Sequence, residues 1–455
     1  MPLTKIEILG FRGFKRRGTL SFAIPNGNPG SGLTVITGPN NSGKSSILEC
    51  LKARNGYQSP SFTMGARNAN IEEVSIRYTI NGKHETISSL KKGSSETKKE
   101  GVDPNFQIFV LPSRRAFNPY FHRSESSRFE HLHQHTLAAQ RTSMLSGFEN
   151  RLFTILKNQS AFNEILHEIL PTKPEWSIDQ SDQGQYFLKF FNGNDSHSSD
   201  GMGEGIVSIF AIVDSLYDSK PGDVIVIDEP ELSLHPALQK RVAAILFKFS
   251  ADRQIVVSTH SSYFVDLKGL ANGGHLARVT TGSEGTIIHE ISPTAKNSII
   301  RLSEGNLYNP HVFGLDAREL FFQEDQIILT EGQEDVLLFP RVAEQIKATI
   351  QGSFFGWGAG GASNIKHLCQ ILKDLGYKKV AGLFDSDKIE EKNRLISEFP
   401  EFFFACIPAK DIRTKPQRKA TDEVQGLLDP KLQIRPEYAP EMKALFDKLF
   451  KHMSS

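Results

Sequence analysis

Two aspartates in the last fifth of the chain follow an apolar run and stand two positions apart. Residues 381–384 (AGLF) are typical of a buried strand, and Asp385 and Asp387 come directly after them. Alternate residues of an extended strand point the same way, so these two carboxylates lie side by side. Neighbouring carboxylates repel each other unless a cation lies between them. The spacing therefore indicates a cation site at this strand end.

A second strand-like run, residues 326–330 (QIILT), also ends in acids. Glu331 follows it, and Asp335 stands at the start of a helix-like run. From residue 325 the pattern predicts strand, helix, strand, helix and strand, which implies a small parallel sheet whose strand ends share one edge. We therefore expect all four acids to gather at that edge. A site of carboxylates without His or Cys favours Mg²⁺ or Mn²⁺.

Three glycines in the same segment permit another interpretation. Gly356, Gly358 and Gly361 satisfy G-x-G-x-x-G, and Asp385 ends the following strand, as in a dinucleotide-binding fingerprint. A ribose-binding acid needs no companion at Asp387, and it needs no acids on the preceding strand. The sequence therefore favours the metal site over a nicotinamide or flavin site.

Residues 38–46 (GPNNSGKSS) fit the phosphate-loop pattern G-x-x-x-x-G-K-[ST]. A strand pattern precedes them and a helix pattern follows, which is the context that such a loop requires. Successive backbone N–H groups then converge on phosphate oxygens at the helix N-terminus. Lys44 would neutralise the β- and γ-phosphates, and Ser45 would bind Mg²⁺. The residues predicted to bind ATP here are Gly38, Asn40, Asn41, Ser42, Gly43, Lys44, Ser45 and Ser46.

A partner motif, VIVIDEPE, occupies residues 224–231. Its apolar run predicts a buried strand that ends in two acids. Asp228 would hold the Mg²⁺ through water, and Glu229 is the candidate base for the attacking water. His260 ends another apolar strand pattern, QIVVSTH, where it could hydrogen-bond the γ-phosphate.

These motifs, in this order, resemble the ATP-binding cassette (ABC) head family, in the branch with the structural-maintenance, recombination and overcoming-lysogenization-defect (OLD) ATPases. The opening IEILGFRGF resembles that branch as well, which implies that Arg12 lies near the adenine. SSDGMGEGI (residues 198–206) stands where the family has its S-x-G-x-G-like signature. The resemblance implies that Ser199, Gly201 and Gly203 act on the nucleotide of another subunit.

The acidic segment resembles the Toprim domain, with its E-G-x-x-D and D-x-D motifs, and GGASN resembles the turn of OLD-family members. An ABC head joined to a Toprim domain is the OLD layout. It implies an α/β fold: an ABC-type ATPase head with a helical insertion, followed by a small parallel-sheet Toprim domain. It also implies an ATP-regulated, metal-dependent DNA endonuclease, often a bacterial anti-phage effector. Its predicted catalytic residues are Glu229, His260, Glu331, Asp385 and Asp387.

The predicted domains are an ABC-type ATPase at 1–300, a linker at 301–324 and a Toprim nuclease domain at 325–455. A helical pattern at about 118–172 is the candidate dimerisation element, because the family forms dimers or tetramers through helices inserted in the ATPase. A co-encoded partner, such as a retron reverse transcriptase with its DNA, fits the same resemblance. The polar segment 91–105 is predicted to be a loop.

The composition limits the possible partners. The 455 residues carry 53 Lys and Arg against 52 Asp and Glu, a net charge of +1, so DNA contacts must come from local patches. The basic residues of segment 407–423 are candidates, namely Lys410, Arg413, Lys415, Arg418 and Lys419. Three cysteines far apart, no signal-peptide core and no run of transmembrane length lead us to expect a cytoplasmic protein without a membrane anchor.

Two rival interpretations stay open at this stage. The first is a non-cleaving, ATP-gated sensor or scaffold that regulates a partner protein or nucleic acid complex. The second is a topoisomerase or primase, but the sequence shows neither a tyrosine-bearing breakage domain nor a nucleotidyl-transfer context. Intact acids at all four positions favour a nuclease over the first of these.

Overall fold

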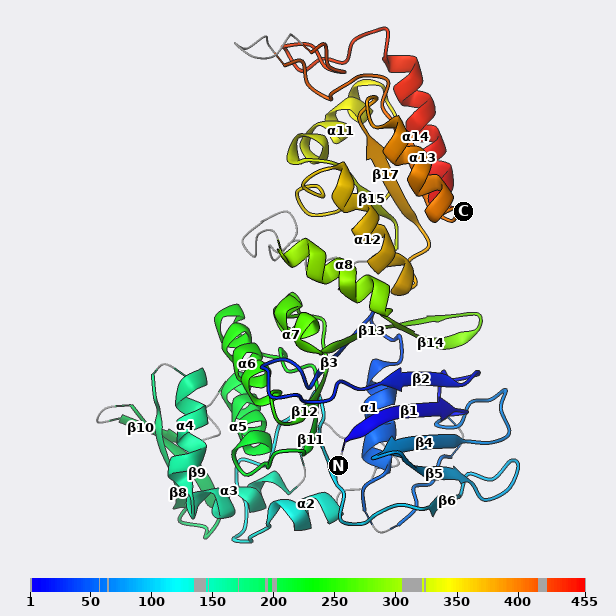
Figure 1. Cartoon of the computed structure of the whole chain (residues 1–455). Helices are drawn as coiled ribbons and strands as arrows, with labels where there is room; N and C mark the ends of the chain where they lie inside the picture. The colour runs from blue at the N-terminus through cyan, green and yellow to red at the C-terminus, as the bar shows by residue number, and fades with distance from the viewer. Residues whose placement is uncertain are drawn as a thin grey trace. The chain divides into compact units, whose positions relative to one another are not determined.

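The computed structural model divides into two compact units, Met1–Glu290 and Ile291–Ser455 (Figure 1). The predicted domain boundary at residue 300 falls inside helix α8 (Pro293–Glu304), which packs against a helix of the second unit. The structure describes residues 2–56, 58–63, 65–134, 145, 147–170, 172–192, 195–198, 203–304, 321–322, 325–415 and 424–454.

A mostly parallel sheet forms the centre of the first unit. Its described strands run in the order β14-β13-β3-β12-β11-β7, and only β14 is antiparallel. β3, β11 and β12 are buried along their whole length, as expected where both faces of a parallel sheet are covered. The bounds are β3 (Leu33–Thr37), β7 (Ile108–Leu111), β11 (Val224–Asp228), β12 (Gln254–Ser258), β13 (His275–Gly282) and β14 (Gly285–Glu290).

Helices cover the two faces of this sheet. Figure 1 shows α1 (Lys44–Ala53) on one face and α5 (Glu204–Tyr217) and α6 (Pro236–Phe249) on the other. A short helix, α7 (Leu267–Asn272), precedes β13. The phosphate loop therefore joins a central strand to the helix that covers one face, as the sequence predicts.

An antiparallel sheet packs against α1. Its described order is β2-β1-β4-β5-β6, and β4 and β5 form an antiparallel hairpin. The prediction of a loop over 91–105 is wrong in part, because β6 lies within it. There, Lys99 donates hydrogen bonds to the carbonyls of Arg54, Asn55 and Gly56 at the end of α1, which no local pattern reveals. The bounds are β1 (Leu3–Leu9), β2 (Gly18–Ser21), β4 (Ser75–Ile80), β5 (Lys83–Ser89) and β6 (Thr97–Glu100).

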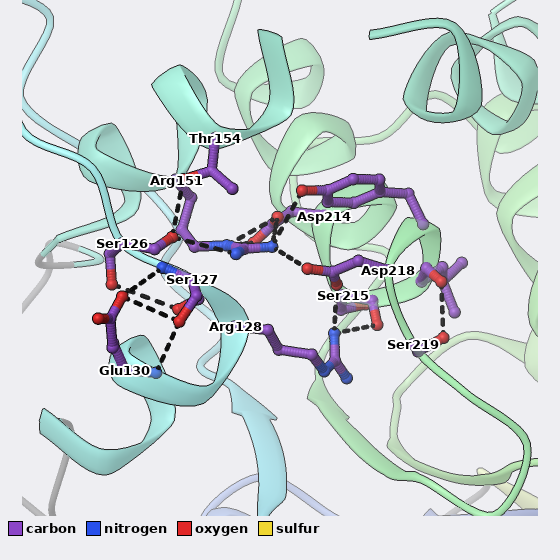
Figure 2. Close-up of polar contacts among 12 residues, drawn as sticks. Ser126, Ser127, Arg128, Glu130, Arg151, Thr154, Asp214, Ser215, Asp218 and Ser219 are labelled. Atoms are coloured by element: carbon purple, nitrogen blue, oxygen red, sulfur yellow. Dashed lines mark hydrogen bonds and ion pairs between the residues drawn. The ribbon is translucent and has the colours of Figure 1, made fainter. Parts of the chain in front are cut away.

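The described part of the inserted segment contains the helices α2, α3 and α4, as predicted, but residues 118–127 before them are not helical and three strands follow them. Figure 2 shows how its Arg151 is anchored to α5. The guanidinium is fully buried and lies 2.8 Å from Asp214 and 2.5 Å from Asp218. Losing one partner of such a pair would leave an uncompensated buried charge, so the insertion and α5 are held together. The elements are α2 (Arg128–Gln134), α3 (Phe148–Leu156), α4 (Gln159–Ile169), β8 (Glu175–Gln180), β9 (Tyr186–Asn192) and β10 (Asp195–Ser198).

The second unit contains the predicted parallel sheet. Its described strands run in the order β16-β15-β17-β18, all parallel. Helix α8 packs against α12, so the start of the segment expected to be a connection is a helix of this unit. The bounds are β15 (Ile327–Leu329), α11 (Gln333–Gln345), β16 (Ser353–Phe354), α12 (Ala362–Asp374), β17 (Val380–Phe384), α13 (Ile389–Glu398), β18 (Phe403–Cys406) and α14 (Ala439–Ser454). In the part of the chain that the structure describes, no helix combines the length and apolar character needed to cross a membrane.

Candidate functional site

The phosphate loop is held in a shape that only glycine adopts easily at two positions. Gly38 has φ +139° and Gly43 has φ +106°. A Cβ atom at Gly38 would lie 2.1 Å from the carbonyl oxygen of Val279 on β13, so a larger residue would push the neighbouring strand away. The loop therefore folds tightly over the end of β3, with the N–H groups of α1 at its mouth.

Lys44 lies across this loop. Its Nζ donates to the carbonyls of Gly38 and Pro39, both at 2.9 Å. Burial lowers the pKa of the ammonium, and attraction to the carboxylates of Asp228, Glu229 and Glu231 opposes that shift. The structure thus brings Lys44 close to the acids of the 224–231 motif. Asn40 and Asn41 are exposed on the loop, and Ser45 and Ser46 lie in the first turn of α1.

Three buried oxygens near the strand ends have no hydrogen-bond partner within the described residues. They are the Oγ atoms of Ser42 and Ser258 and the Oδ1 of Asp228. A buried carboxylate oxygen without a partner is costly unless a cation or water satisfies it. The residues therefore fit a Mg²⁺ ion, which Ser45 and Asp228 would hold together with phosphate oxygens and water.

Glu229 and His260 lie beside each other at the ends of neighbouring strands. The Nε2 of His260 is 3.9 Å from the Oε1 of Glu229, and the two side chains are 34% and 30% exposed. Both are therefore accessible to water and to a nucleotide. Burial and the charge of Lys44 lower the pKa of His260, which favours the neutral form of its imidazole. A neutral imidazole can either donate or accept a hydrogen bond near the γ-phosphate.

Two residues that the sequence interpretation missed support these acids. Glu231 accepts hydrogen bonds from the His260 backbone N–H at 2.6 Å and the Thr259 hydroxyl at 2.8 Å. These bonds fix the backbone at His260. Arg115 donates to the backbone carbonyls of Asp228 and Glu229. The third acid of VIVIDEPE was a signal for Glu231, whereas nothing local distinguishes Arg115 from its neighbour Arg114.

The signature segment is described only in part. Ser199 and Gly201 lie outside the described residues, and Gly203 directly precedes α5 with an extended backbone. In the first turn of α5, Glu204 accepts a hydrogen bond from Ser233 at 3.0 Å. The signature therefore leads into a helix that contacts the loop after β11. Its action on another subunit stays a prediction.

In the second unit, the four predicted acids follow the carboxyl ends of two adjacent parallel strands, β15 and β17. Asp385 directly follows β17, and its backbone N–H donates to Glu331 Oε1 at 3.2 Å. Asp335 lies in the first turn of α11 and accepts from the Gly332 N–H at 2.9 Å. Asp387 is more exposed and lies 3.1 Å from Lys388. The structure thus gathers these carboxylates at the predicted edge of the sheet.

The pKa values of this cluster show that its acids face one another. Burial, followed by repulsion from Asp335, Glu331, Asp411 and Asp387, raises the pKa of Asp385 to about 8. Burial chiefly raises the pKa of Asp335 to about 6, and burial also raises that of Glu331. The sequence interpretation did not include Asp411, which is 8% exposed and follows β18. We call Glu331, Asp335, Asp385, Asp387 and Asp411 the carboxylate cluster.

The basic segment after β18 contributes cations at the margin of the cluster. Lys415 pairs with Asp411, and Arg413 lies 2.8 Å from Glu334. Lys410 is exposed, whereas Arg418 and Lys419 lie outside the described residues. These ion pairs leave Asp335 and Asp385 facing acids, which is the arrangement that a hard divalent cation would relieve.

No three His, Cys, Asp or Glu side chains among the described residues already stand close enough together to hold a metal ion. The cluster fits Mg²⁺ or Mn²⁺ by its donor chemistry and its mutual repulsion, so ion binding would draw the carboxylates together.

The glycine fingerprint has a structural role beside this cluster. A Cβ atom on Gly358 would lie 2.6 Å from the backbone of Gly332, and the Gly361 N–H donates to the Glu331 carbonyl at 2.9 Å. Gly358 therefore lets the turn pack directly on the strand end that carries Glu331. This close approach gives Gly358 a structural role that needs no dinucleotide.

Two family profiles match the chain. Residues 33–266, just over half of it, match the family described as "AAA domain, putative AbiEii toxin, Type IV TA system". Residues 321–387 match the family described as "Overcoming lysogenization defect protein-like, TOPRIM domain". The chain belongs to the OLD family of ATPase–Toprim proteins. The first match of this OLD-family chain contains the phosphate loop and His260, and the second contains the four predicted acids.

Relatives of this OLD-family chain align over short regions. The Old nuclease of Escherichia phage P2 is 30% identical over 117 residues, which are 26% of this chain and 19% of that protein. The chromosome partition protein Smc of Halothermothrix orenii is 37% identical over 71 residues, 16% of this chain and 5% of that protein. The SMC head domain from Thermotoga maritima has a TM-score of 0.38 and 17% identity, and the match covers 64% of this chain and 100% of that one.

Proposed function

We propose that this OLD-family protein is an ATP-regulated, divalent-metal-dependent DNA endonuclease. The observation that supports the proposal most is the carboxylate cluster at the carboxyl edge of a parallel sheet, in which the pKa of Asp385 is raised to about 8. The same chain holds a phosphate loop between β3 and α1, and a buried aspartate and a glutamate at the end of β11. Each half thus has the groups that one of the two reactions needs.

In the ATPase, the chain's own residues bind and orient the nucleotide. The N–H groups at the start of α1 and Lys44 receive the phosphates, and Asp228 with Ser45 would hold Mg²⁺. Glu229 accepts a proton from the attacking water, while His260 contacts the γ-phosphate.

In the nuclease, Glu331, Asp335, Asp385 and Asp387 would hold Mg²⁺ or Mn²⁺. When bound, such an ion polarises a phosphodiester and lowers the pKa of a bound water. The carboxylates would hold the ion at the edge of the sheet, where Asp387 is half-exposed to solvent. Lys410 and Arg413 are candidates to contact the DNA backbone.

The wider setting follows the same proposal. DNA is the substrate, and a homo-oligomer, a dimer or tetramer, would form through the helical insertion. We propose that the protein acts as a bacterial anti-phage effector. It would act alone or with a partner such as a retron reverse transcriptase and its DNA. Protection of a host culture against phage, lost in Asp385→Asn, tests that role.

The nuclease proposal is tested with supercoiled plasmid. Wild-type protein should nick or linearise it with Mg²⁺ or Mn²⁺ and ATP, and chelation should stop the reaction. Asp385→Asn should abolish cleavage because it removes a charge of the cluster and keeps the shape of the side chain. Glu401→Gln is the matched control, since this carboxylate of the same unit pairs with Lys373 at 2.8 Å outside the cluster. Equal cleavage by Asp385→Asn and wild type would contradict the site.

One observation favours the rival function, an ATP-gated sensor without cleavage. Among the described residues, no three potential ligands are already arranged around a metal position. If wild-type protein fails to cleave plasmid with either ion, with and without ATP, while it still hydrolyses ATP, the sensor replaces the nuclease as the best account.

A further inference from the structure

A buried arginine joins three elements around the ATP site. Arg115 follows β7, the edge strand beside β11, and is 4% exposed. Its Nη1 donates to the carbonyls of Asp228 at 2.7 Å and Pro112 at 2.8 Å, and its Nη2 donates to the Glu229 carbonyl at 2.8 Å. Its Nε donates to Ser208 Oγ on α5 at 2.8 Å.

Two of the three guanidinium nitrogens, Nη1 and Nη2, hold consecutive carbonyls of the motif that contains the candidate base. Glu229 has φ +46°, a left-handed conformation that costs free energy in any residue with a Cβ atom. A strained backbone persists only where its surroundings hold it in place, and the bonds to Arg115 act directly on the carbonyl of that residue. The hydrogen bonds from Arg115 therefore influence the direction of the Glu229 side chain.

Arginine suits this position for a geometric reason. Its planar group presents several N–H donors in a fixed fork, whereas a lysine ammonium is a single point of charge on a flexible stem. Burial lowers the pKa of Arg115 to about 10, which still leaves it protonated at pH 7. A lysine here could not reach the two carbonyls and Ser208 together.

The bond to Ser208 connects the base to the signature helix. Ser208 is buried near the start of α5, the helix that follows the signature segment. The far end of α5 is tied to the helical insertion by Arg151 (Figure 2). A shift of α5 therefore has a direct path of hydrogen bonds to the backbone of Glu229.

We propose that Arg115 is a positioning residue for ATP hydrolysis, which orients Glu229 by holding its backbone and links that orientation to α5. The proposal rests on the role of Glu229 as the base. Arg115 donates to backbone carbonyls of the chain itself, so its loss should change turnover and not nucleotide affinity.

The test compares variants by kcat, KM and the affinity for a fluorescent ATP analogue. Arg115→Lys should lower kcat by about 100-fold, the size of effect that a small misplacement of a reacting group can have, with KM changed by less than about threefold. Arg115→Gly should regain at least about fivefold in kcat when millimolar guanidinium is added, because the free ion can occupy the vacated site. Ser208→Ala, which removes only the link to α5, should lower kcat by about threefold.

Arg54→Lys is the matched control, because it also replaces a fully buried guanidinium but pairs with Glu85 on β5 and not with α5. It should lose stability and keep kcat per folded molecule. An unchanged kcat in Arg115→Lys, or a parallel loss in Arg54→Lys without guanidinium rescue of Arg115→Gly, would overturn the proposal. An unchanged kcat in Ser208→Ala would overturn the link to α5. Normal hydrolysis by Glu229→Gln would instead show that Glu229 is not the base. That result is separate from the results for Arg115, so the two failures can be distinguished.

Discussion

The two acidic sites of this chain differ in what their carboxylates face. In the ATPase, Asp228, Glu229 and Glu231 lie near the Lys44 ammonium, and a backbone N–H and a hydroxyl hold Glu231. In the Toprim unit the acids chiefly face one another, so the pKa of Asp385 is raised to about 8. The first site contains its own cation and the second needs one.

This difference indicates the charge of each ligand. A triphosphate is strongly negative, so its site combines a lysine and a helix N-terminus with acids that act on magnesium and water. A carboxylate cluster without a cation at its centre is stabilised by a divalent ion. The chain can therefore lose one ligand without losing the other, which the following variants test.

The largest effect is expected from Lys44→Ala. It should weaken ATP binding by at least about 100-fold, because the helix N-terminus alone neutralises only part of the charge of the triphosphate. Isothermal titration with ATP and Mg²⁺ measures this. Lys240→Ala, which removes an exposed lysine of the same unit, should bind normally. Wild-type affinity in Lys44→Ala would contradict the assignment of the phosphate loop.

Glu229→Gln should bind ATP and hydrolyse it at least about 100-fold more slowly, since the amide cannot accept the proton of the attacking water. Phosphate release at saturating ATP is the measurement. Hydrolysis within about tenfold of wild type would move the role of base elsewhere, with His260 first in line.

The stability of the metal-free protein should depend on pH through the carboxylate cluster. The folded-state pKa of Asp385 is about 8, above its unfolded value of about 4, so the folded chain binds more protons in that window. Stability from this group is therefore complete below about pH 4 and is lost as the pH rises through about 8. Thermal unfolding across this range should show a decline that is smaller in Asp385→Asn. A variant with the same pH profile as wild type would show that Asp385 is not the source.

A smaller effect is expected at the margin of the cluster. Asp411 lies beside the other acids: it repels Asp385 and Asp335, and it pairs with Lys415. Asp411→Asn changes these surroundings and leaves the four predicted ligands in place, so it should reduce plasmid cleavage by about tenfold without abolishing it. Its cleavage rate across a Mg²⁺ titration shows whether the loss lies in metal affinity. Complete loss of cleavage at saturating metal would place Asp411 among the ligands themselves.

The sequence predicted what adjacent residues determine. The phosphate loop, the strand ends at Asp228 and Asp385, and the parallel order of the second sheet all follow from short patterns with a fixed spacing. Strand ends in a parallel sheet share one edge, so the contact between Glu331 and Asp385 could also be predicted from the sequence.

What it could not predict depends on contacts between distant segments. Arg115 reaches carbonyls 113 and 114 positions away, and Lys99 holds carbonyls 43 to 45 positions away. Asp411 enters the cluster only because β18 lies beside β17. Each is a polar residue in an irregular or edge segment, where no periodicity indicates its partner.

Binding of Mn²⁺, followed by electron paramagnetic resonance, tests the contrast between the two sites most directly. Without nucleotide, wild-type protein and Lys44→Ala should both bind Mn²⁺ at the carboxylate cluster, and Asp385→Asn should lose that binding. Addition of ATP should create a further bound ion in Asp385→Asn but not in Lys44→Ala, because Asp228 and Ser45 complete their site only with phosphate oxygens. If nucleotide-free wild type binds no Mn²⁺, or if Asp385→Asn binds it as wild type does, the account of the carboxylate cluster is wrong.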